Sequence, residues 1–134
     1  MAGRMKVIYK MWFDNSGTAF GEGPYRLLKG VEKTGSLWRA AVAMEMAYSK
    51  ARRIIACCEQ NLGFTLITRK AGGVSGGGSK VTPEAIELMG KYERVRAQME
   101  GVLSATYAKH FGERAEVQFY EMEIRKRGRR RTAQ

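Results

Sequence analysis

The sequence has few of the residues on which enzymes and metal sites depend. It has one histidine, His110, and two cysteines, Cys57 and Cys58. Because the cysteines are adjacent and have no partners at metal-ligand spacing, neither a disulfide framework nor a zinc site is expected. His110 has no nucleophile or carboxylate at an evident spacing, and the carboxylates are scattered along the chain. The sequence therefore predicts a protein that is not an enzyme and that holds no metal or cofactor.

Long apolar runs are also absent from the chain. No stretch approaches the ~20 consecutive apolar residues of a membrane-spanning helix. The N-terminus has no basic segment followed by an apolar one, so we expect the protein to remain in the cytoplasm. With 134 residues and 44% hydrophobic content, the chain is long enough for one modest core but too short for two substantial ones.

Acidic residues are outnumbered by basic ones. The chain has 13 Asp and Glu against 24 Lys and Arg, and its formal net charge is +11. Such an excess indicates a polyanionic partner, of which nucleic acid is the commonest, although charge alone leaves anionic lipid open. Six cations stand together near the C-terminus: Arg125, Lys126, Arg127, Arg129, Arg130 and Arg131. We expect this tail to be disordered and solvated, and to attract DNA without regard to its sequence.

A helical pattern between residues 48 and 62 has one apolar face and one cationic face. The apolar residues recur at steps of three and four: Tyr48, Ala51, Ile55, Cys58 and Leu62. The opposite face is small, polar and cationic: Ser49, Lys50, Arg52, Arg53, Ala56, Cys57 and Gln60. A recognition helix buries one stripe against its own domain and offers donors to phosphates and base edges with the other. The pattern is therefore typical of a helix that reads DNA.

A shorter helical pattern over residues 37 to 44 precedes it. Gly35 suits the left-handed position after the preceding helix, and Ser36 suits the N-cap of this one. Residues 45 to 47 then form a connection of the length expected in a helix-turn-helix. Taken alone, a short amphipathic helix pair is more commonly ordinary core packing, so the downstream sequence has to decide.

Downstream, a glycine-rich segment separates two strand patterns. Phe64 to Arg69 alternates like a strand, and a β-like pattern resumes at Val81. Five of the nine residues between Lys70 and Lys80 are glycines, in an order that matches neither a phosphate loop nor a dinucleotide fingerprint. We interpret the segment as a glycine-tipped hairpin whose cations Arg69, Lys70 and Lys80 follow a DNA backbone, as in a wing. A flexible surface loop is the alternative.

Further patterns flank this region. Residues 5 to 13 are rich in β-branched and aromatic residues and predict one strand, and Pro24 opens a helix.

A long helix begins at Pro83, after the cap residue Thr82, and extends to about Lys109. Its apolar seam alternates steps of four and three: Leu88, Tyr92, Val95, Met99, Val102 and Thr106. The seam predicts pairing with a second copy, with packing inside the same domain as the alternative. Residues 113 to 125 fit either a strand or a short helix.

This order of elements predicts a mainly α fold with a small β wing. From about Gly23 to Glu100 the sequence also resembles the DNA-binding domain of ModE-type molybdate-responsive regulators, in LLKGVEKTGSLWRAA, AYSKARRII, NLGFTLITR and GGVSGGGSKVT. The segment CCEQNLGFTLITR more distantly resembles the winged helix of LysR-type regulators. The resemblance implies a winged helix-turn-helix homodimer that acts on promoter DNA.

The sequence departs from the ModE-type pattern in three ways. Ala47 stands where that family usually has a serine cap, and Arg52 stands where it usually has tryptophan. Full-length members also carry C-terminal oxyanion-binding domains, and the residues after Glu100 are too few for one. Molybdate sensing is therefore not expected to transfer with the fold.

We expect a winged helix-turn-helix domain with an N-terminal strand and a dimerisation helix over residues 1 to 112. Residues 113 to 134 form an uncertain extension with the basic tail. The expected function is transcriptional regulation through double-stranded DNA, with no membrane association. A nonspecific nucleic-acid-binding protein and a small anion-binding or adaptor protein are the alternatives. The target sequence, the direction of regulation and any effector do not follow from the residues. The expected DNA-binding residues are Arg39, Ser49, Lys50, Arg52, Arg53, Gln60, Arg69, Lys70 and Lys80.

Overall fold

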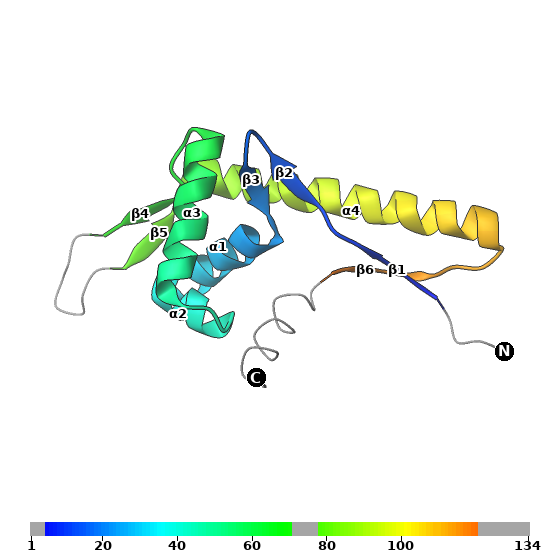
Figure 1. Cartoon of the computed structure of the whole chain (residues 1–134), viewed down its shortest axis with the longest axis horizontal. Coiled ribbons are helices and arrows are strands. Elements are labelled where there is room, and N and C mark those ends of the chain that lie inside the picture. Colours follow the sequence, from blue (N-terminus) through cyan, green and yellow to red (C-terminus); the bar gives the residue numbers. More distant parts are fainter. Residues whose placement is uncertain (1–4, 71–77, 121–134) are drawn as a thin grey trace. The chain divides into compact units, whose positions relative to one another are not determined.

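The structure is a computed structural model that describes residues 5–70 and 78–120 (Figure 1). In chain order its elements are β1 (Lys6–Tyr9), β2 (Trp12–Asp14), β3 (Thr18–Gly21), α1 (Glu22–Thr34), α2 (Leu37–Ala43), α3 (Tyr48–Leu62), β4 (Ile67–Arg69), β5 (Ser79–Val81), α4 (Pro83–Phe111) and β6 (Glu116–Phe119). The described part of the chain is mostly helical, as predicted, and its strands form two-stranded sheets. The chain divides into a larger unit, Met11–Tyr92, and a smaller unit made of Met1–Lys10 and Glu93–Gln134.

The core of the larger unit lies where α1, α2 and α3 meet. Leu27, Leu28 and Val31 of α1 are completely or almost completely buried. From α3 the predicted stripe is confirmed, because Ala51, Ile55 and Cys58 are buried, and the terminal residues of the stripe pack partly buried against the same cluster. The three buried α3 residues follow the 3.6-residue period, which leaves the other side of the helix free to face solvent.

The corner between α1 and α2 has the caps that the sequence predicts. Gly35 adopts a left-handed conformation with φ 72°, and its N–H donates to the Val31 carbonyl at 2.7 Å. The Ser36 hydroxyl accepts a hydrogen bond from the Arg39 backbone N–H at 3.1 Å. These two bonds end α1 and start α2 within two residues, so the chain turns sharply there.

The turn between α2 and α3 is also close to the prediction. α2 ends at Ala43 and α3 begins at Tyr48, so four residues connect the helices, one more than the predicted 45 to 47. Ala47 makes no side-chain cap bond, because its methyl group has no atom that can accept a hydrogen bond. The other end of α3 is capped as expected by Gly63, with φ 85° and an N–H that donates to the Glu59 backbone carbonyl at 2.8 Å.

The single N-terminal strand predicted for residues 5 to 13 is wrong. The chain instead makes two strands, β1 and β2, with different partners: β2 pairs antiparallel with β3, while β1 pairs in parallel with β6. The sequence pattern did not predict β3, which occupies Thr18–Gly21 between the predicted strand and the predicted helix. α1 accordingly begins at Glu22, two residues earlier than Pro24. Strand pairing between distant segments overrides the local alternation here.

The predicted hairpin is present but shorter than its first strand pattern suggested. β4 pairs antiparallel with β5, with Ile67 opposite Val81 and Arg69 opposite Ser79. Of residues 64 to 69, only the last three are strand, and the backbone N–H of Leu66, just before them, donates to the Glu59 carboxylate at 2.7 Å. The glycine-rich tip, residues 71–77, lies outside the described residues, as does the basic tail.

In the smaller unit, β1 and β6 form a parallel pair beside the second part of α4. The register places Lys6 opposite Glu116 and Tyr9 opposite Phe119, so the open question about residues 113 to 125 resolves to a strand for 116–119. The Tyr9 hydroxyl donates to the Glu100 carboxylate, and burial, reinforced by that bond, raises the pKa of Tyr9 to about 12. The Arg96 guanidinium lies 4.7 Å from the centre of the Phe119 ring.

The apolar seam of α4 changes character along the helix. Tyr92 is completely buried and its hydroxyl donates to Glu22 at 2.9 Å, whereas Val95 and Met99 are each 42% exposed and Val102 is 59% exposed. Packing of the seam within its own domain, the alternative to pairing with a second copy, thus holds only for the first turns of α4. None of the helices in the described ranges combines the length and hydropathy that crossing a membrane requires.

Candidate nucleic-acid interface

The outward face of α3 carries the side chains that we expected to meet DNA. Ser49, Lys50, Arg52, Arg53 and Gln60 are all exposed, while the opposite face is buried in the core. Ser49 and Gln60 are eleven residues apart, so the face extends over about 16 Å of helix at 1.5 Å per residue. A helix with this division presents donors along its length while its own domain holds it in place.

The cations of the hairpin do not form a single row. Arg69 shares a face of the β4–β5 hairpin with Ile67, because side chains alternate along a strand and paired residues share a face. Lys80 is paired with Thr68 and therefore lies on the opposite face, where both residues are exposed. We expected Arg69 and Lys80 to follow one DNA backbone together. Because they lie on opposite faces of the hairpin, they could contact DNA only from opposite sides of it.

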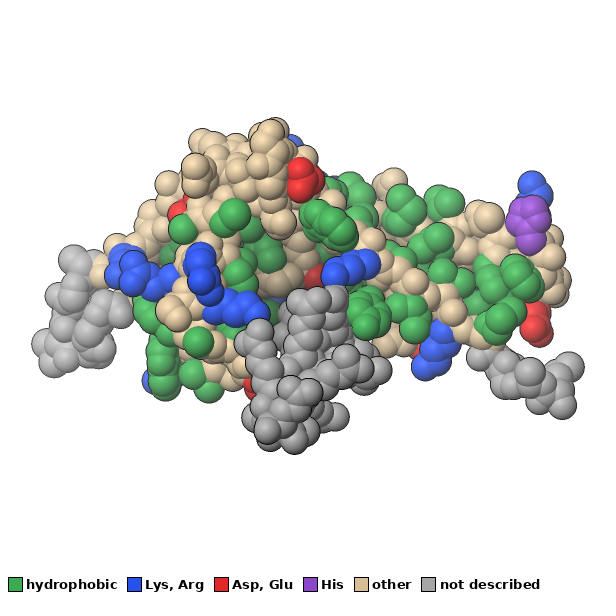
Figure 2. Space-filling view, viewed as in Figure 1, with side chains coloured by type: hydrophobic (Ala, Val, Ile, Leu, Met, Phe, Trp, Pro, Cys, Tyr) green, Lys and Arg blue, Asp and Glu red, His purple; other side chains and the backbone are tan. Residues whose placement is uncertain are grey.

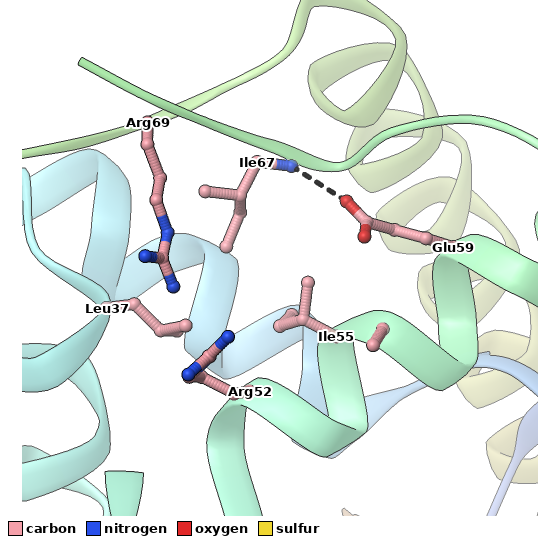
Figure 3. Close-up of a pocket in the computed structure, with 7 residues that line it drawn as sticks. Leu37, Arg52, Ile55, Glu59, Ile67 and Arg69 are labelled. Atoms are coloured by element: carbon pink, nitrogen blue, oxygen red, sulfur yellow. Dashed lines mark hydrogen bonds between the residues drawn. The ribbon is translucent and has the colours of Figure 1, made fainter. Parts of the chain in front are cut away.

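Arg69 and Arg52 come together at a hollow of about 180 Å³ between α3 and β4, called here the α3–β4 hollow. Its lining residues are Leu37, Arg52, Ile55, Ala56, Glu59, Ile67 and Arg69. Leu37 and Ile55 are almost completely buried and form its apolar floor. Figure 3 shows both guanidinium groups on the side of the hollow near Leu37.

Tyr48 links the two arginines. The Arg69 Nη2 atom donates to the Tyr48 hydroxyl at 3.3 Å, and the Arg52 guanidinium carbon lies 5.8 Å from the centre of the Tyr48 ring. Neither arginine has an ion-pair partner among residues 5–70 and 78–120. Their positive charges are therefore held near each other by an aromatic side chain and not neutralised by a carboxylate.

Glu59, the acidic residue that lines the α3–β4 hollow, was not among the site residues expected from the sequence. Its Oε2 atom accepts hydrogen bonds from the backbone N–H of Leu66 at 2.7 Å and of Ile67 at 3.3 Å. Figure 3 shows the carboxylate on the side of the hollow opposite the arginines. Two features of the sequence could have indicated a role for Glu59. It is the single carboxylate in residues 48 to 62, and it stands just before a helix end that leads into a strand.

A second hollow, of about 360 Å³, adjoins the hairpin on the side of α2. It is lined by Ser36, Leu37, Trp38, Tyr48, Arg69, Lys70, Gly78 and Ser79. The backbone N–H of Ser79 donates to the Gly35 carbonyl at 2.8 Å and so joins the hairpin to the α1–α2 corner. Trp38, which the sequence analysis did not consider as a surface residue, is 58% exposed here. Arg69 lines both hollows.

The remaining predicted cations are exposed at the edges of this surface. Arg39 lies on α2, and Lys70 follows β4, where its backbone N–H donates to the Gly78 carbonyl at 2.8 Å. Figure 2 shows Lys and Arg side chains gathered over α3 and the β4–β5 hairpin. We define the cationic surface as Arg39, Lys50, Arg52, Arg53, Arg69, Lys70 and Lys80, none of which is ion-paired within the described parts of the chain.

The two cysteines of α3 differ in accessibility. Cys57 is exposed beside the cationic surface, whereas Cys58 is buried in the core. Burial raises the pKa of the Cys58 thiol to about 11. In residues 5–70 and 78–120, no three His, Cys, Asp or Glu side chains gather as a metal site would require.

Comparison with known proteins shows distant relatives connected with molybdenum. The chain is 30% identical over 87 residues to the molybdenum transport protein ModE of Azotobacter vinelandii, an alignment that covers 65% of this chain and 32% of that protein. It is 27% identical over 92 residues to the molybdenum-pterin-binding protein MopB of Rhodobacter capsulatus, covering 69% and 34% respectively. The chain thus spans about a third of the length of these relatives. No protein-family model matches the sequence.

Proposed function

We propose that the larger unit is a winged helix-turn-helix that binds duplex DNA, and that the protein regulates transcription. In this assignment α2 and α3 are the helix-turn-helix, α3 is the recognition helix, and the β4–β5 hairpin is the wing. The observation that carries the proposal is the outward face of α3, whose cations have no carboxylate partners among the residues that the structure describes, while the opposite face is packed in the core. Such a face has affinity for phosphates and carries donors for base edges.

The arrangement of the flanking elements supports this assignment. The hairpin is joined to the α1–α2 corner through Ser79 and Gly35, and to α3 through Glu59 and the start of β4. Cations on α2, α3 and the hairpin therefore belong to one connected framework. The resemblance of the motifs to ModE-type DNA-binding domains, and the distant similarity to ModE itself, agree with the proposal.

We further propose that the protein acts as a homodimer through the exposed part of the α4 seam. Val95, Met99 and Val102 leave an apolar stripe in solvent, at the spacing that pairs helices in coiled coils. One recognition helix contacts a short stretch of duplex, and two copies related by a two-fold axis would read half-sites about 34–36 Å apart.

The two alternatives make different demands on the outward face of α3. A nonspecific nucleic-acid-binding protein needs only its charge, whereas a regulator needs donors that distinguish base edges. Ser49, Arg53 and Gln60 provide neutral and forked donors on one face, which favours base reading over charge alone. An anion-binding or adaptor protein does not need an extended cationic surface that spans two helices and a hairpin.

Selection of bound sequences from a random duplex pool tests the proposal. A regulator yields an enriched motif, with two related half-sites if it binds as a dimer. The matched control is Lys91→Gln, which removes one positive charge outside the cationic surface, from a lysine paired with Glu87 at 3.1 Å. Lys50→Gln should weaken binding to the selected duplex, whereas Lys91→Gln should leave it nearly unchanged. If no motif is enriched, the proposal of a sequence-specific regulator fails, and nonspecific nucleic-acid binding is supported instead.

A further inference from the structure

We propose that the α3–β4 hollow is a phosphate clamp, in which the guanidinium groups of Arg52 and Arg69 hold one phosphate group between them. The inference rests on the proposed function only where the phosphate is taken to come from DNA. The ligand class is a tetrahedral oxyanion, which either the DNA backbone or free inorganic phosphate supplies. Its site is smaller and more specific than the cationic surface as a whole.

Two like charges approach one small space, the α3–β4 hollow. Arg52 comes from α3 and Arg69 from β4, and both line the same hollow of about 180 Å³. Neither is paired with a carboxylate in the described parts of the chain. Two adjacent cations repel each other, and an anion between them removes that repulsion while it accepts bonds from both. A guanidinium offers its donors in a planar fork that matches phosphate oxygens.

Tyr48 orients both arginines without using up their donors. Its hydroxyl accepts one bond from Arg69 at 3.3 Å, and its ring lies 5.8 Å from the Arg52 guanidinium carbon. Each guanidinium carries five N–H donors, so most of them stay available to a ligand. Orienting the side chains before the ligand arrives lowers the entropy that binding would otherwise lose.

Glu59, the acidic residue in the lining, is engaged by the backbone and lies away from the arginines. A free carboxylate would repel a phosphate, but Glu59 accepts bonds from the backbone N–H groups of Leu66 and Ile67. Figure 3 shows the carboxylate, bonded to the Ile67 N–H, on the far side of the hollow from the arginines. The carboxylate therefore holds the start of β4, the strand that carries Arg69, and is turned away from the place where an anion would sit.

The size and chemistry of the α3–β4 hollow suit a phosphate group. A volume of about 180 Å³ is several times the ~30 Å³ that one water molecule occupies in the liquid, which leaves room for a tetrahedral oxyanion and its waters. Its floor, Leu37 and Ile55, is apolar, as is Ile67 in the lining, so none of these side chains adds a competing hydrogen-bond acceptor. The guanidinium groups are the donors that face a ligand there.

The DNA arm of the test is a double-mutant cycle on binding to the selected duplex. Arg52→Gln and Arg69→Gln should each weaken binding by about tenfold, since bonds to a charged group are the strong ones. The double variant should lose less than the product of the two, by at least about twofold, because both side chains hold one phosphate. Arg52→Lys, which keeps the charge and loses the fork, should also weaken binding.

The matched control uses Arg53, the neighbouring residue of α3, which does not line the hollow. Arg53→Gln removes the same charge from the same helix. The fold-losses in affinity caused by Arg53→Gln and Arg69→Gln should simply multiply in the double variant, because the two residues contact different groups. Thermal unfolding of every variant shows whether a loss of binding comes from a loss of folded protein.

The second arm adds inorganic phosphate to the protein without DNA and follows the side-chain Nε–H signals of its arginines by nuclear magnetic resonance. Chloride at the same ionic strength is the reference, because it reproduces the screening without the tetrahedral geometry. If the clamp takes free phosphate, the Arg52 and Arg69 signals shift in a saturable way and the Arg53 signal does not. The Tyr48→Phe variant should weaken this response, since it removes the hydroxyl that orients Arg69.

The outcomes separate the clamp from the proposed function. Coupling in the DNA arm supports a clamp for a backbone phosphate, and saturable shifts in the second arm support one for free phosphate. A wild-type protein that binds the duplex, shows additive losses and gives no phosphate response would overturn the clamp and leave DNA binding intact. A wild-type protein that binds no duplex would overturn the proposed function, and the phosphate response alone would then decide about the clamp.

Discussion

Arg53 and Ile55, two residues apart on α3, lie on opposite faces of the helix. Arg53 is exposed on the outward face, and Ile55 is only 5% exposed within the core. This relationship confirms the face assignment made from the sequence period. Substitutions on the two faces should therefore produce different defects, in DNA binding at Arg53 and in stability at Ile55.

Arg53→Ala should lower DNA binding without lowering the stability of the fold. An arginine in a good base contact contributes about 1 to 3 kcal/mol of discrimination against the wrong base. Ile55→Ala should instead reduce the free energy of unfolding by about 2 to 5 kcal/mol, because it leaves a cavity in the core. Anisotropy with the selected duplex and thermal unfolding measure the two effects. An Arg53→Ala protein with wild-type affinity and a much lower melting temperature would contradict the assignment.

Gly30→Ala should destabilise the larger unit by about 1 to 3 kcal/mol, as overpacking does. A Cβ at Gly30 would lie 2.6 Å from the Ala40 Cβ, so α1 and α2 are in contact at this point. The control is Gly101→Ala in α4, where a Cβ would meet no atom within 4 Å. That change should raise stability by up to about 1 kcal/mol through helix propensity alone. Equal effects of the two changes in denaturant unfolding would show that the α1–α2 contact is looser than described.

Met99→Asp should convert a dimer into folded monomers that bind DNA weakly. Met99 is 42% exposed on the seam of α4, and a charge placed in a paired apolar seam loses its hydration without gaining a partner. Sedimentation at tens of micromolar, with circular dichroism to confirm folding, measures the change. A wild-type monomer at that concentration, or a variant that remains dimeric, would remove this part of α4 as the interface.

Removal of residues 125 to 134 should flatten the salt dependence of DNA binding and leave sequence preference unchanged. These residues lie outside the described part of the chain, and the prediction rests on their six positive charges. Each phosphate contact contributes about −0.9 to the slope of log affinity against log salt. Affinities measured over a range of salt concentrations give the slope. If the truncated protein no longer distinguished the selected duplex from a scrambled one at equal occupancy, the tail would be reading bases.

Iodoacetamide should alkylate Cys57 well before Cys58 in the folded protein at pH 8. Cys57 is exposed, and burial both shields the Cys58 thiol and raises its pKa from 9.0 to about 11, so little of the reactive thiolate is present. Because the folded pKa is the higher one, this group contributes stability below about pH 9 that is lost as the pH rises through 11. Mass spectrometry of the labelled peptides, with Cys57→Ser and urea-unfolded protein as references, measures the order. Equal labelling of both thiols would show that α3 leaves the core.

The capped ends of the helices followed from the sequence because their determinants are local, whereas α1 begins at Glu22, two residues before the predicted Pro24. Gly35, Ser36 and Gly63 act through conformation and hydrogen bonds within a few residues, and Thr82 caps α4 through its hydroxyl, which accepts from Ala85 at 3.1 Å. The apolar stripe of α3 was readable for the same reason, since the helical period places its members on one face whatever they pack against. The cations of the candidate surface were likewise identifiable as exposed.

The arrangement of those cations was decided by tertiary structure alone. The pairing of β4 with β5 separates Arg69 from Lys80 and directs Arg69 toward Arg52 on α3. The parallel pairing of β1 with β6 joins segments more than 100 residues apart in the chain, and no local pattern predicts such a partner. Periodicity and caps encode which face a side chain occupies on its own element. Which side chains meet across elements depends on register and on packing between distant segments, and those contacts form only when the core does.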